Sequence, residues 1–411
     1  MERDAAFSSE LLHAAMRGNG REHGAARLDP RDQALATEIA LGCLRRQGEI
    51  DHLIAAAGRP VAKLDPEVRA ALRMGCYQLR YLDRIPAAAA VSESIELVKL
   101  ARKRSAAGFV NAVLRHLPPR PEPSEAGALS YPAWIVERWG KNYGPELAAG
   151  ILAAGLVPPP AYLRLNPGLD AEETLRLLAD EGVETEPTEL PLARRVIAGR
   201  PQASRCHAQG RFRIQDLSSQ CVVPLLDLIP GCSFLDLCAA PGGKTFQAIE
   251  LLGSARGVVA ADRHLHRLRT LRELASGTVD CVVLDARTQL PLCRDFDRVL
   301  VDAPCSGTGT LARNPEIKWR LQPSDIDSLA AKQRDLLRNA LRSVVPGGVL
   351  VYATCSLEPE ENQEVVDRVL RRETSFRLGA CFQRVPGREP GDGFFACQIR
   401  RDCGDPQLPM G

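Results

Sequence analysis

The C-terminal half of the chain alternates short apolar runs with stretches of helical periodicity. The apolar runs, bounded by glycine and acidic residues, lie at Ser233–Leu237, Gly257–Ala261, Val279–Leu284, Phe296–Val301 and Val349–Tyr352. Helical patterns lie between several of them, at 244–252, 263–276 and 325–343. Apolar strands that alternate with helices predict an α/β fold with a parallel sheet covered on both faces. Ligands bind beyond the carboxyl ends of the strands in such sheets, so the residues after each run are the candidates for function.

The N-terminal part of the chain predicts a separate helical domain over residues 1–120. Its apolar residues recur every three or four positions, as at Val68, Leu72, Cys76 and Leu79. The length of 411 residues leaves room for such a domain, because single hydrophobic cores rarely grow beyond roughly 250–300 residues. The prolines within 118–130 then predict a linker.

Residues 131–210 predict a small α+β module. Tyr162–Leu165 alternates like a strand, residues 171–182 have helical spacing, and a second short strand is expected near Val183. The third expected domain, at 211–400, contains the alternating apolar runs.

The distribution of charge and the spacing of the cysteines indicate which binding partners and which cellular compartment suit this chain. Residues 1–120 carry 19 Lys and Arg against 14 Asp and Glu, which suits a nucleic-acid partner, although the basic run at 99–104 is equally well read as a solvated helix face. The 13 cysteines include no C-x-x-C pair, which argues against a disulfide framework and against zinc. Without an apolar h-region or an apolar stretch of about 18 residues, we expect a cytoplasmic protein with no signal peptide, no membrane span and no metal.

The first apolar run leads into a loop rich in small residues, Cys238-Ala239-Ala240-Pro241-Gly242-Gly243-Lys244-Thr245. Small residues let the backbone approach a ligand closely, at the point where a helix begins with free N–H groups. Gly243-Lys244-Thr245 matches the end of the phosphate-loop pattern G-x-x-x-x-G-K-[ST], but the pattern requires glycine at position 238, where this chain has Cys238. Pro241 also removes one of the backbone N–H groups that such a loop would donate to a phosphate. The alternative is a nucleoside-containing cofactor such as S-adenosylmethionine.

Acidic and thiol side chains follow the other runs. Asp262 is placed to bind ribose hydroxyls and Asp285 to touch an adenine edge, while helix capping is the alternative for both. Asp302 and Cys305 follow the fourth run, and Cys355 follows the fifth. A single buried cysteine usually acts as a small apolar side chain. Two cysteines in polar loops at the ends of two strands indicate instead that the thiols take part in a reaction.

Several ordered motifs of this chain resemble those of the RNA cytosine-C5 methyltransferases of the Sun/nucleolar-protein family. The matching segments are 214–220, the loop at 238–245, 302–309, 313–319, 354–356 and 392–395. The segments 31–37 and 109–115 resemble the helical domain, similar to the antitermination factor NusB, that precedes the catalytic domain in the ribosomal RNA branch of the family. One departure is Leu284, where the family often has glycine before the acid.

This resemblance implies a Rossmann-like methyltransferase domain that binds S-adenosyl-L-methionine, preceded by a NusB-like domain and an RNA-recognition-like module. It implies a cofactor site made by Cys238, Ala239, Ala240, Pro241, Gly242, Gly243, Lys244, Asp262, Asp285 and Asp302. By the same resemblance Cys355 is the nucleophile and Cys305 serves product release. Asp302 would hydrogen-bond the base, and Lys244 would complete the site unless it simply faces solvent at the helix start.

The implied reaction methylates carbon 5 of a cytidine in 16S ribosomal RNA. Addition of a thiolate to carbon 6 makes carbon 5 nucleophilic, and the later loss of a proton and of the thiolate gives a second thiol a role. The target base must be unpaired or flipped before a thiol reaches it. We expect a monomer acting on naked or early-assembled small-subunit RNA. The alternatives are a transfer RNA methyltransferase and an RNA-binding assembly factor without activity.

Overall fold

The structure is a computed structural model that describes residue 12 and residues 29–403. The chain divides into two units. The first unit contains residues 1–159 together with 310–321, and the second contains residues 160–309 together with 322–411.

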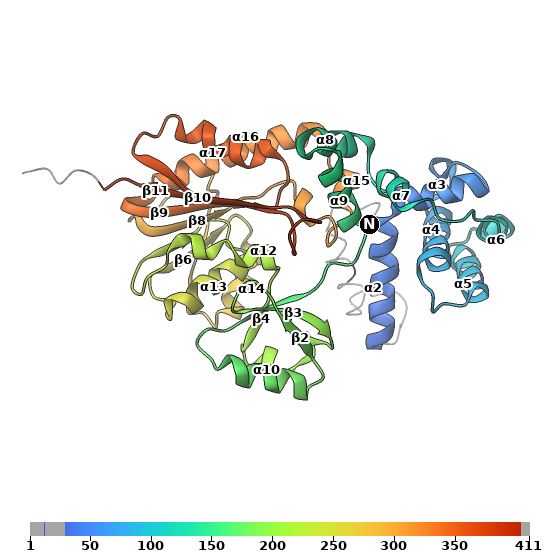
Figure 1. The fold of residues 1–411 in the computed structure, drawn as a ribbon, viewed down its shortest axis with the longest axis horizontal. Coiled ribbons are helices and arrows are strands. Elements are labelled where there is room, and N and C mark those ends of the chain that lie inside the picture. Colours follow the sequence, from blue (N-terminus) through green and yellow to red (C-terminus); the bar gives the residue numbers. More distant parts are fainter. Residues whose placement is uncertain (1–11, 13–28, 404–411) are drawn as a thin grey trace, which may run out of the picture. The chain divides into compact units, whose positions relative to one another are not determined.

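The first unit is helical in its described part (Figure 1). Prolines begin several of its helices, at the position where a missing N–H group costs nothing, and the Asp29 side chain caps the first of them by accepting from Arg31 N and Asp32 N. Its core is formed by Ile50, Leu72, Val98, Val110 and their neighbours. The helices are α2 (Pro30–Arg45), α3 (Gln47–Ala57), α4 (Pro66–Tyr81), α5 (Ala87–Leu100), α6 (Ala107–Arg115), α7 (Pro123–Leu129), α8 (Ala133–Tyr143), α9 (Pro145–Ala154) and α15 (Ile317–Arg320).

The prolines after residue 118 do not prevent helix formation. Residues 123–129, which the sequence indicates as linker, form α7, because Pro123 occupies the first helical position, which tolerates proline. Residues 133–154 form α8 and α9 and belong to the helical unit, whereas the sequence places them in the α+β module.

The motif at 313–319 is part of the helical unit's interior. The Lys318 ammonium is fully buried, donates to the carbonyl of Arg45 at 2.6 Å and lies 3.7 Å from the ring centre of Tyr131. The indole of Trp319 donates to the carbonyl of Leu44 at 3.0 Å. These contacts give the motif a structural role in the unit.

The second unit begins with a four-stranded antiparallel sheet in the order β2-β3-β1-β4. Leu163, Leu178 and Phe212 fill the core between this sheet and α10. Its elements are β1 (Tyr162–Leu165), α10 (Ala171–Asp180), β2 (Glu184–Pro187), β3 (Ala193–Ala198), α11 (Arg205–Ala208) and β4 (Phe212–Ile214). The first strand, the helix and the second strand agree with the sequence prediction.

The larger sheet of the second unit has seven strands in the order β10-β11-β9-β8-β5-β6-β7. The five strands from β9 to β7 are parallel, and β11 and β10 add to the edge in antiparallel fashion. The strands are β5 (Phe234–Asp236), β6 (Val258–Asp262), β7 (Asp280–Val283), β8 (Phe296–Asp302), β9 (Val344–Thr354), β10 (Phe376–Arg384) and β11 (Phe394–Arg401). All five predicted apolar runs therefore coincide with parallel strands.

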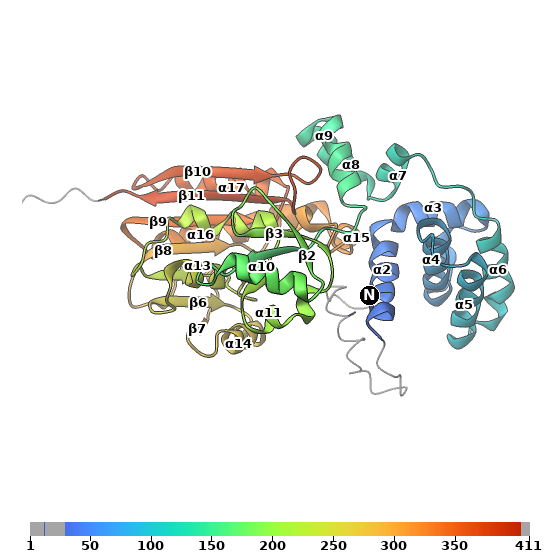
Figure 2. The same ribbon diagram turned by 60° about the horizontal axis from the view of Figure 1, so that its bottom comes forward.

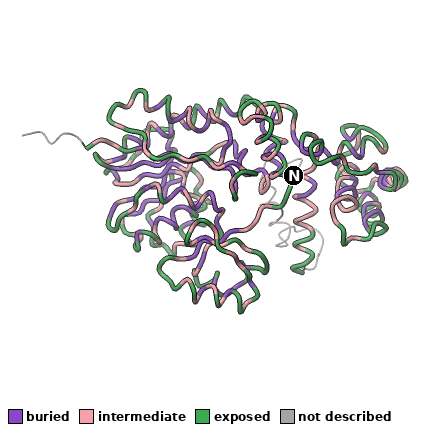
Figure 3. The backbone as a smooth tube through the Cα atoms, in the orientation of Figure 1, coloured by how far each residue is buried: buried purple, intermediate pink, exposed green. Residues whose placement is uncertain are grey.

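Helices cover both faces of this sheet, as predicted (Figures 1 and 2). The helices α16 (Pro323–Leu341) and α17 (Gln363–Leu370) pack on one face through Leu336, Leu337 and Val366. The helices α13 (Gly243–Leu252) and α14 (Leu265–Leu274) pack on the other through Phe246 and Leu271. Figure 3 shows the central strands as largely buried, and the loops after β8 and β9 are largely buried as well.

The chain runs outward from β5 to β6 and β7 and then returns to β8 on the other side of β5. The carboxyl ends of β5 and β8 therefore flank the topological switch point, where ligands bind in open α/β sheets.

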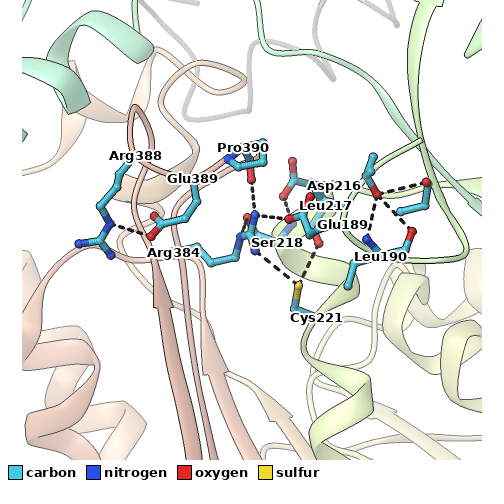
Figure 4. A network of polar contacts seen from close by, with 12 residues as sticks. Glu189, Leu190, Asp216, Leu217, Ser218, Cys221, Arg384, Arg388, Glu389 and Pro390 are labelled. Atoms are coloured by element: carbon cyan, nitrogen blue, oxygen red, sulfur yellow. Dashed lines mark hydrogen bonds and ion pairs between the residues drawn. The ribbon is translucent and has the colours of Figure 1, made fainter. Parts of the chain in front are cut away.

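A polar network joins the small sheet to the edge of the large one (Figure 4). The guanidinium of Arg384, at the end of β10, donates to Ser218 Oγ at 3.1 Å and to Glu189 Oε1 at 2.7 Å. The carboxylate of Asp216 accepts from the backbone N–H of Asp392 at 3.1 Å. The motifs at 214–220 and 392–395, distant in sequence, thus contact each other and serve the framework.

One cysteine pair forms a disulfide, although the cysteine spacing argues against a disulfide framework. Cys381 on β10 and Cys397 on β11 form a disulfide, because the antiparallel register places them directly opposite each other. Their separation of 16 residues carries no sequence signal of such a pairing.

Candidate active site

The loop after β5 is shaped by its small residues. Gly242 has a φ of +111°, and a Cβ there would lie 2.7 Å from the Phe246 ring. Ala239 N–H donates to the carbonyl of Ala261, which ties the loop to β6. The helix α13 begins directly afterwards at Gly243. The first turn of this helix therefore starts at the carboxyl edge of the sheet, as the sequence predicts.

Asp262 at the end of β6 is buried and holds the loop. Its carboxylate accepts from the N–H of Ala240 at 3.3 Å and from the N–H of His264 at 2.8 Å. Asp285, beyond β7, is half-buried and forms a bidentate ion pair with Arg287, with Nε to Oδ1 at 2.9 Å. Hydrogen bonding from Arg287 lowers the pKa of Asp285 to about 2. Both carboxylates face one cavity.

Lys244 does not face solvent. Its ammonium donates to Asp302 Oδ2 at 2.6 Å, lies 4.7 Å from the ring centre of Phe394, and the residue is 9% exposed. The helix start at Gly243 and the end of β8 are thereby linked by a charged hydrogen bond.

Asp236, the last residue of β5, is a fourth carboxylate in this region and is almost completely buried. Its Oδ2 accepts from the Thr245 hydroxyl at 2.7 Å, while its Oδ1 has no hydrogen-bond partner among the described residues. Burial raises the pKa of Asp236 to about 7. A buried oxygen without a donor fits a ligand that brings a cationic or N–H group.

The cavity at the switch point has a volume of about 300 Å³. Its polar lining includes Asp262, Asp285 and Asp302, and Leu329 and Leu336 of α16 contribute an apolar wall. Burial and the four surrounding carboxylates, Asp236 and Asp302 first, raise the pKa of the Cys238 thiol far above its usual range. The cavity thus combines an apolar wall with a polar lining in which aspartates alternate with the basic side chains of Arg263, Arg267, Arg287 and Lys332.

The two predicted cysteines meet beside this cavity. Cys305 Sγ and Cys355 Sγ are 3.3 Å apart, and both residues are half-buried. The hydrogen bond with Cys355 is the main cause that raises the pKa of Cys305 well above its usual range, followed by burial. Pro304, which directly precedes Cys305, lines the cavity, so the thiol pair lies close to the cavity without lining it.

Among the described residues no helix is long and apolar enough to cross a membrane. Nor does the described part contain a cluster of His, Cys, Asp and Glu that suits a metal ion.

Family models match three consecutive parts of the chain. Residues 2–118 match the NusB family, residues 131–195 match an RsmF/B-like ferredoxin-like domain, and residues 223–400 match the 16S rRNA methyltransferase RsmB/F. The probable ribosomal RNA small subunit methyltransferase B of Bacillus subtilis (strain 168) is 31% identical over 98% of this chain and 96% of its own length. The chain belongs to the RsmB/F family of 16S rRNA methyltransferases.

Other relatives and solved structures agree with this assignment. The ribosomal RNA small subunit methyltransferase B of Serratia proteamaculans is 35% identical, covering 90% of this chain and 91% of its own. The crystal structure of PH0851 superposes with a TM-score of 0.79 at 26% identity, covering 95% of this chain and 93% of that one. A methyltransferase homolog protein from Pyrococcus horikoshii gives a TM-score of 0.60 at 27% identity, covering 68% and 99%. The predicted fold class, with a NusB-like domain, a small α+β module and a Rossmann-like methyltransferase domain, is confirmed, and the family model describes the module as ferredoxin-like.

In the structure, five of the ten residues that the sequence indicated for the cofactor lie around one cavity. Cys238, Ala240, Asp262, Asp285 and Asp302 line the cavity, whereas the remaining loop residues do not. Sequence reasoning overlooked Asp236, although it ends a strand just as Asp262 does. It also overlooked Leu329, Lys332 and Leu336, because their approach to the cavity depends on how α16 docks.

Proposed function

We propose that this chain transfers a methyl group from S-adenosyl-L-methionine to carbon 5 of a cytidine in small-subunit ribosomal RNA, through a covalent bond between Cys355 and carbon 6 of the base. The observation that carries the proposal is the pair of thiols 3.3 Å apart beside the cavity at the switch point, which Asp262, Asp285 and Asp302 help to line. A single methyltransferase thiol would suffice for nucleophilic attack, whereas two thiols divide attack and release between them.

The residues around the cavity fit this cofactor. The carboxylate of Asp302 suits its positively charged end, and Asp262 suits its ribose hydroxyls. Asp236, which directly precedes the lining residues Leu237 and Cys238, adds a buried Oδ1 without a hydrogen-bond partner among the described residues. The apolar wall of Leu284, Leu329 and Leu336 suits a flat purine. When bound, the cofactor supplies an electrophilic methyl group.

The protein's own groups account for the remaining steps. The Cys355 thiolate adds to carbon 6, and the electron pair of the 5,6 double bond becomes available at carbon 5 to accept the methyl group. Once Cys355 is bonded to carbon 6, its contact no longer raises the pKa of Cys305, so the Cys305 thiol can release its proton to solvent. The resulting Cys305 thiolate takes the proton from carbon 5, the double bond forms again, and the Cys355 thiolate leaves. Asp302, held by Lys244, accepts a hydrogen bond from the exocyclic amine of the base.

The first test is methyl transfer from labelled cofactor to protein-free small-subunit RNA, followed by digestion and identification of the labelled nucleoside. We expect 5-methylcytidine at one site. The Cys305→Ala variant is expected to accumulate a covalent RNA–protein adduct visible as a retarded band on a denaturing gel, and Cys355→Ala to form none. The reverse pattern would exchange the roles of the two thiols.

Labelled nucleoside in transfer RNA alone would redirect the substrate assignment. Absence of label with ribosomal RNA, transfer RNA and assembled subunits would favour a binding factor without activity. We further propose that the protein acts in the cytoplasm and that it is a monomer. Light scattering of the purified protein tests the monomeric state, and cell fractionation tests the compartment.

A further inference from the structure

A buried carboxylate lies directly behind the thiol pair and is not part of the proposed chemistry. Glu361, in the short 3-10 turn Pro359–Glu361 between β9 and α17, has no exposed surface. Its Oε1 accepts from the backbone N–H of Ser306 and from Gln333 Nε2, each at 2.9 Å. Its Oε2 accepts from the hydroxyls of Ser306 and Ser356. One side chain thus accepts four hydrogen bonds.

The donors to Glu361 come from both loops that carry the thiols. Ser306 directly follows Cys305, and Ser356 directly follows Cys355. The two serine hydroxyls are themselves 3.1 Å apart, a separation similar to the 3.3 Å between the two sulfur atoms. The third donor, Gln333 of α16, also donates to the carbonyl of Pro304 at 2.9 Å, which fixes the Cys305 loop from its other side.

We propose that Glu361 is the positioning residue that sets the separation of Cys305 and Cys355, by bridging Ser306 and Ser356. Desolvating a carboxylate completely costs several kcal/mol, and an apolar side chain of similar size would stabilise a core at least as well. The role assigned here rests on the proposed function, since it concerns the two thiols of that mechanism.

Electrostatics supports the same role. Burial raises the pKa of Glu361, while its hydrogen bonds with Ser306, Ser356 and Gln333 oppose the shift. The negative charge of Glu361 is also among the causes that raise the pKa of the Cys305 thiol. Glu361 therefore acts on the second thiol by charge as well as by geometry.

Variants separate positioning from simple stability. In Glu361→Gln the amide oxygen can accept from Ser306 N and Gln333, and its NH₂ group can donate to the two serine hydroxyls, so the bridge survives. Glu361→Ala removes it. The matched control is Glu364→Gln, which neutralises a carboxylate three residues further on that forms only an exposed ion pair with Arg368 at 2.7 Å.

Two readouts are needed. For Glu361→Ala we expect kcat to fall about a hundredfold with unchanged KM for RNA and unchanged cofactor affinity, because a displacement of about 1 Å has an effect of that size. Glu361→Gln is expected to recover most of this loss, and Glu364→Gln to behave as wild type. Equal kcat in wild type and Glu361→Ala would overturn the proposal.

The second readout does not depend on activity. Phenylarsine oxide condenses with two adjacent thiols, forming two As–S bonds and releasing one water without any change of oxidation state. Peptide mapping is expected to find Cys305 and Cys355 bridged by arsenic in wild type, Glu361→Gln and Glu364→Gln, and not in Glu361→Ala or in a Cys305→Ala control.

The two readouts distinguish the possible failures. Capture in wild type without any methyl transfer would reject the proposed function and leave the geometric role standing. Undiminished capture in Glu361→Ala would reject the geometric role whatever the activity. Should Glu361→Ala fail to fold, Ser356→Ala, which removes one of the bridged hydroxyls, is expected to slow capture, and an unchanged rate in that variant would equally overturn the inference.

Discussion

The buried carboxylate of Asp236 makes the stability of the sheet depend on pH. With no hydrogen-bond partner for Oδ1 among the described residues, burial raises its pKa to about 7 from an ordinary value of 3.8. A carboxylate with a raised pKa stabilises the fold fully below its unfolded pKa, and this contribution is lost as pH rises through the folded pKa. The window of loss therefore runs from about pH 4 to about pH 7.

The size of the effect follows from the shift. Each pKa unit corresponds to about 1.4 kcal/mol, so the whole shift amounts to about 4 kcal/mol, of which about 3 kcal/mol falls between pH 5 and pH 8. In Asp236→Asn this dependence is expected to disappear. The new amide places its NH₂ group, which has no acceptor there, at the position of Oδ1; this costs about 1–3 kcal/mol, so the net gain at pH 8 is about 1–3 kcal/mol.

Hydrogen exchange measured by mass spectrometry on peptides that cover β5, without cofactor and corrected for intrinsic exchange, is the suitable assay. The wild-type opening free energy is expected to fall from pH 5 to pH 8, and that of Asp236→Asn to stay level. Asp335→Asn, which changes an exposed carboxylate paired with Arg338, serves as control. Parallel pH profiles for wild type and Asp236→Asn would refute the reasoning. Cofactor affinity is expected to fall in Asp236→Asn, opposite in sign to stability.

Two further predictions concern the loop and the second thiol. Gly242→Ala is expected to destabilise the second unit by about 1–3 kcal/mol and to weaken cofactor binding, because φ is +111° and a Cβ would lie 2.7 Å from Phe246. Thermal unfolding measures the loss, with Gly253→Ala, also at positive φ but with open space around it, as the matched control; equal effects in the two variants would contradict the steric argument. Mass spectrometry is expected to show that iodoacetamide alkylates Cys305 slowly at neutral pH and faster in Cys355→Ala, because the hydrogen bond with Cys355 is the first cause of the raised pKa of Cys305. An unchanged alkylation rate in Cys355→Ala would argue against the thiol–thiol contact.

The periodicity of the sequence was sufficient to predict the parallel strands and the acids and thiols at their ends. Strand ends are local features, and parallel pairing brings all of them to one edge, which is why Asp262, Asp302, Cys305 and Cys355 were identified together. Glu361 was not, because its importance lies in donors from segments about 28 and 55 residues away. Nor did spacing reveal the Cys381–Cys397 pair, which depends on strand register.

The segment 310–321 has a consequence for how the protein is made. Although most of the helical unit is encoded in the first 159 residues, Lys318 and Trp319 complete its interior by donating to carbonyls of Arg45 and Leu44. During synthesis from the N-terminus, the helical unit therefore cannot be completed until residue 321 has left the ribosome, by which time the residues of β5 to β8 have already been synthesised. A fragment cut at residue 159 would lack the contacts that Lys318 and Trp319 contribute.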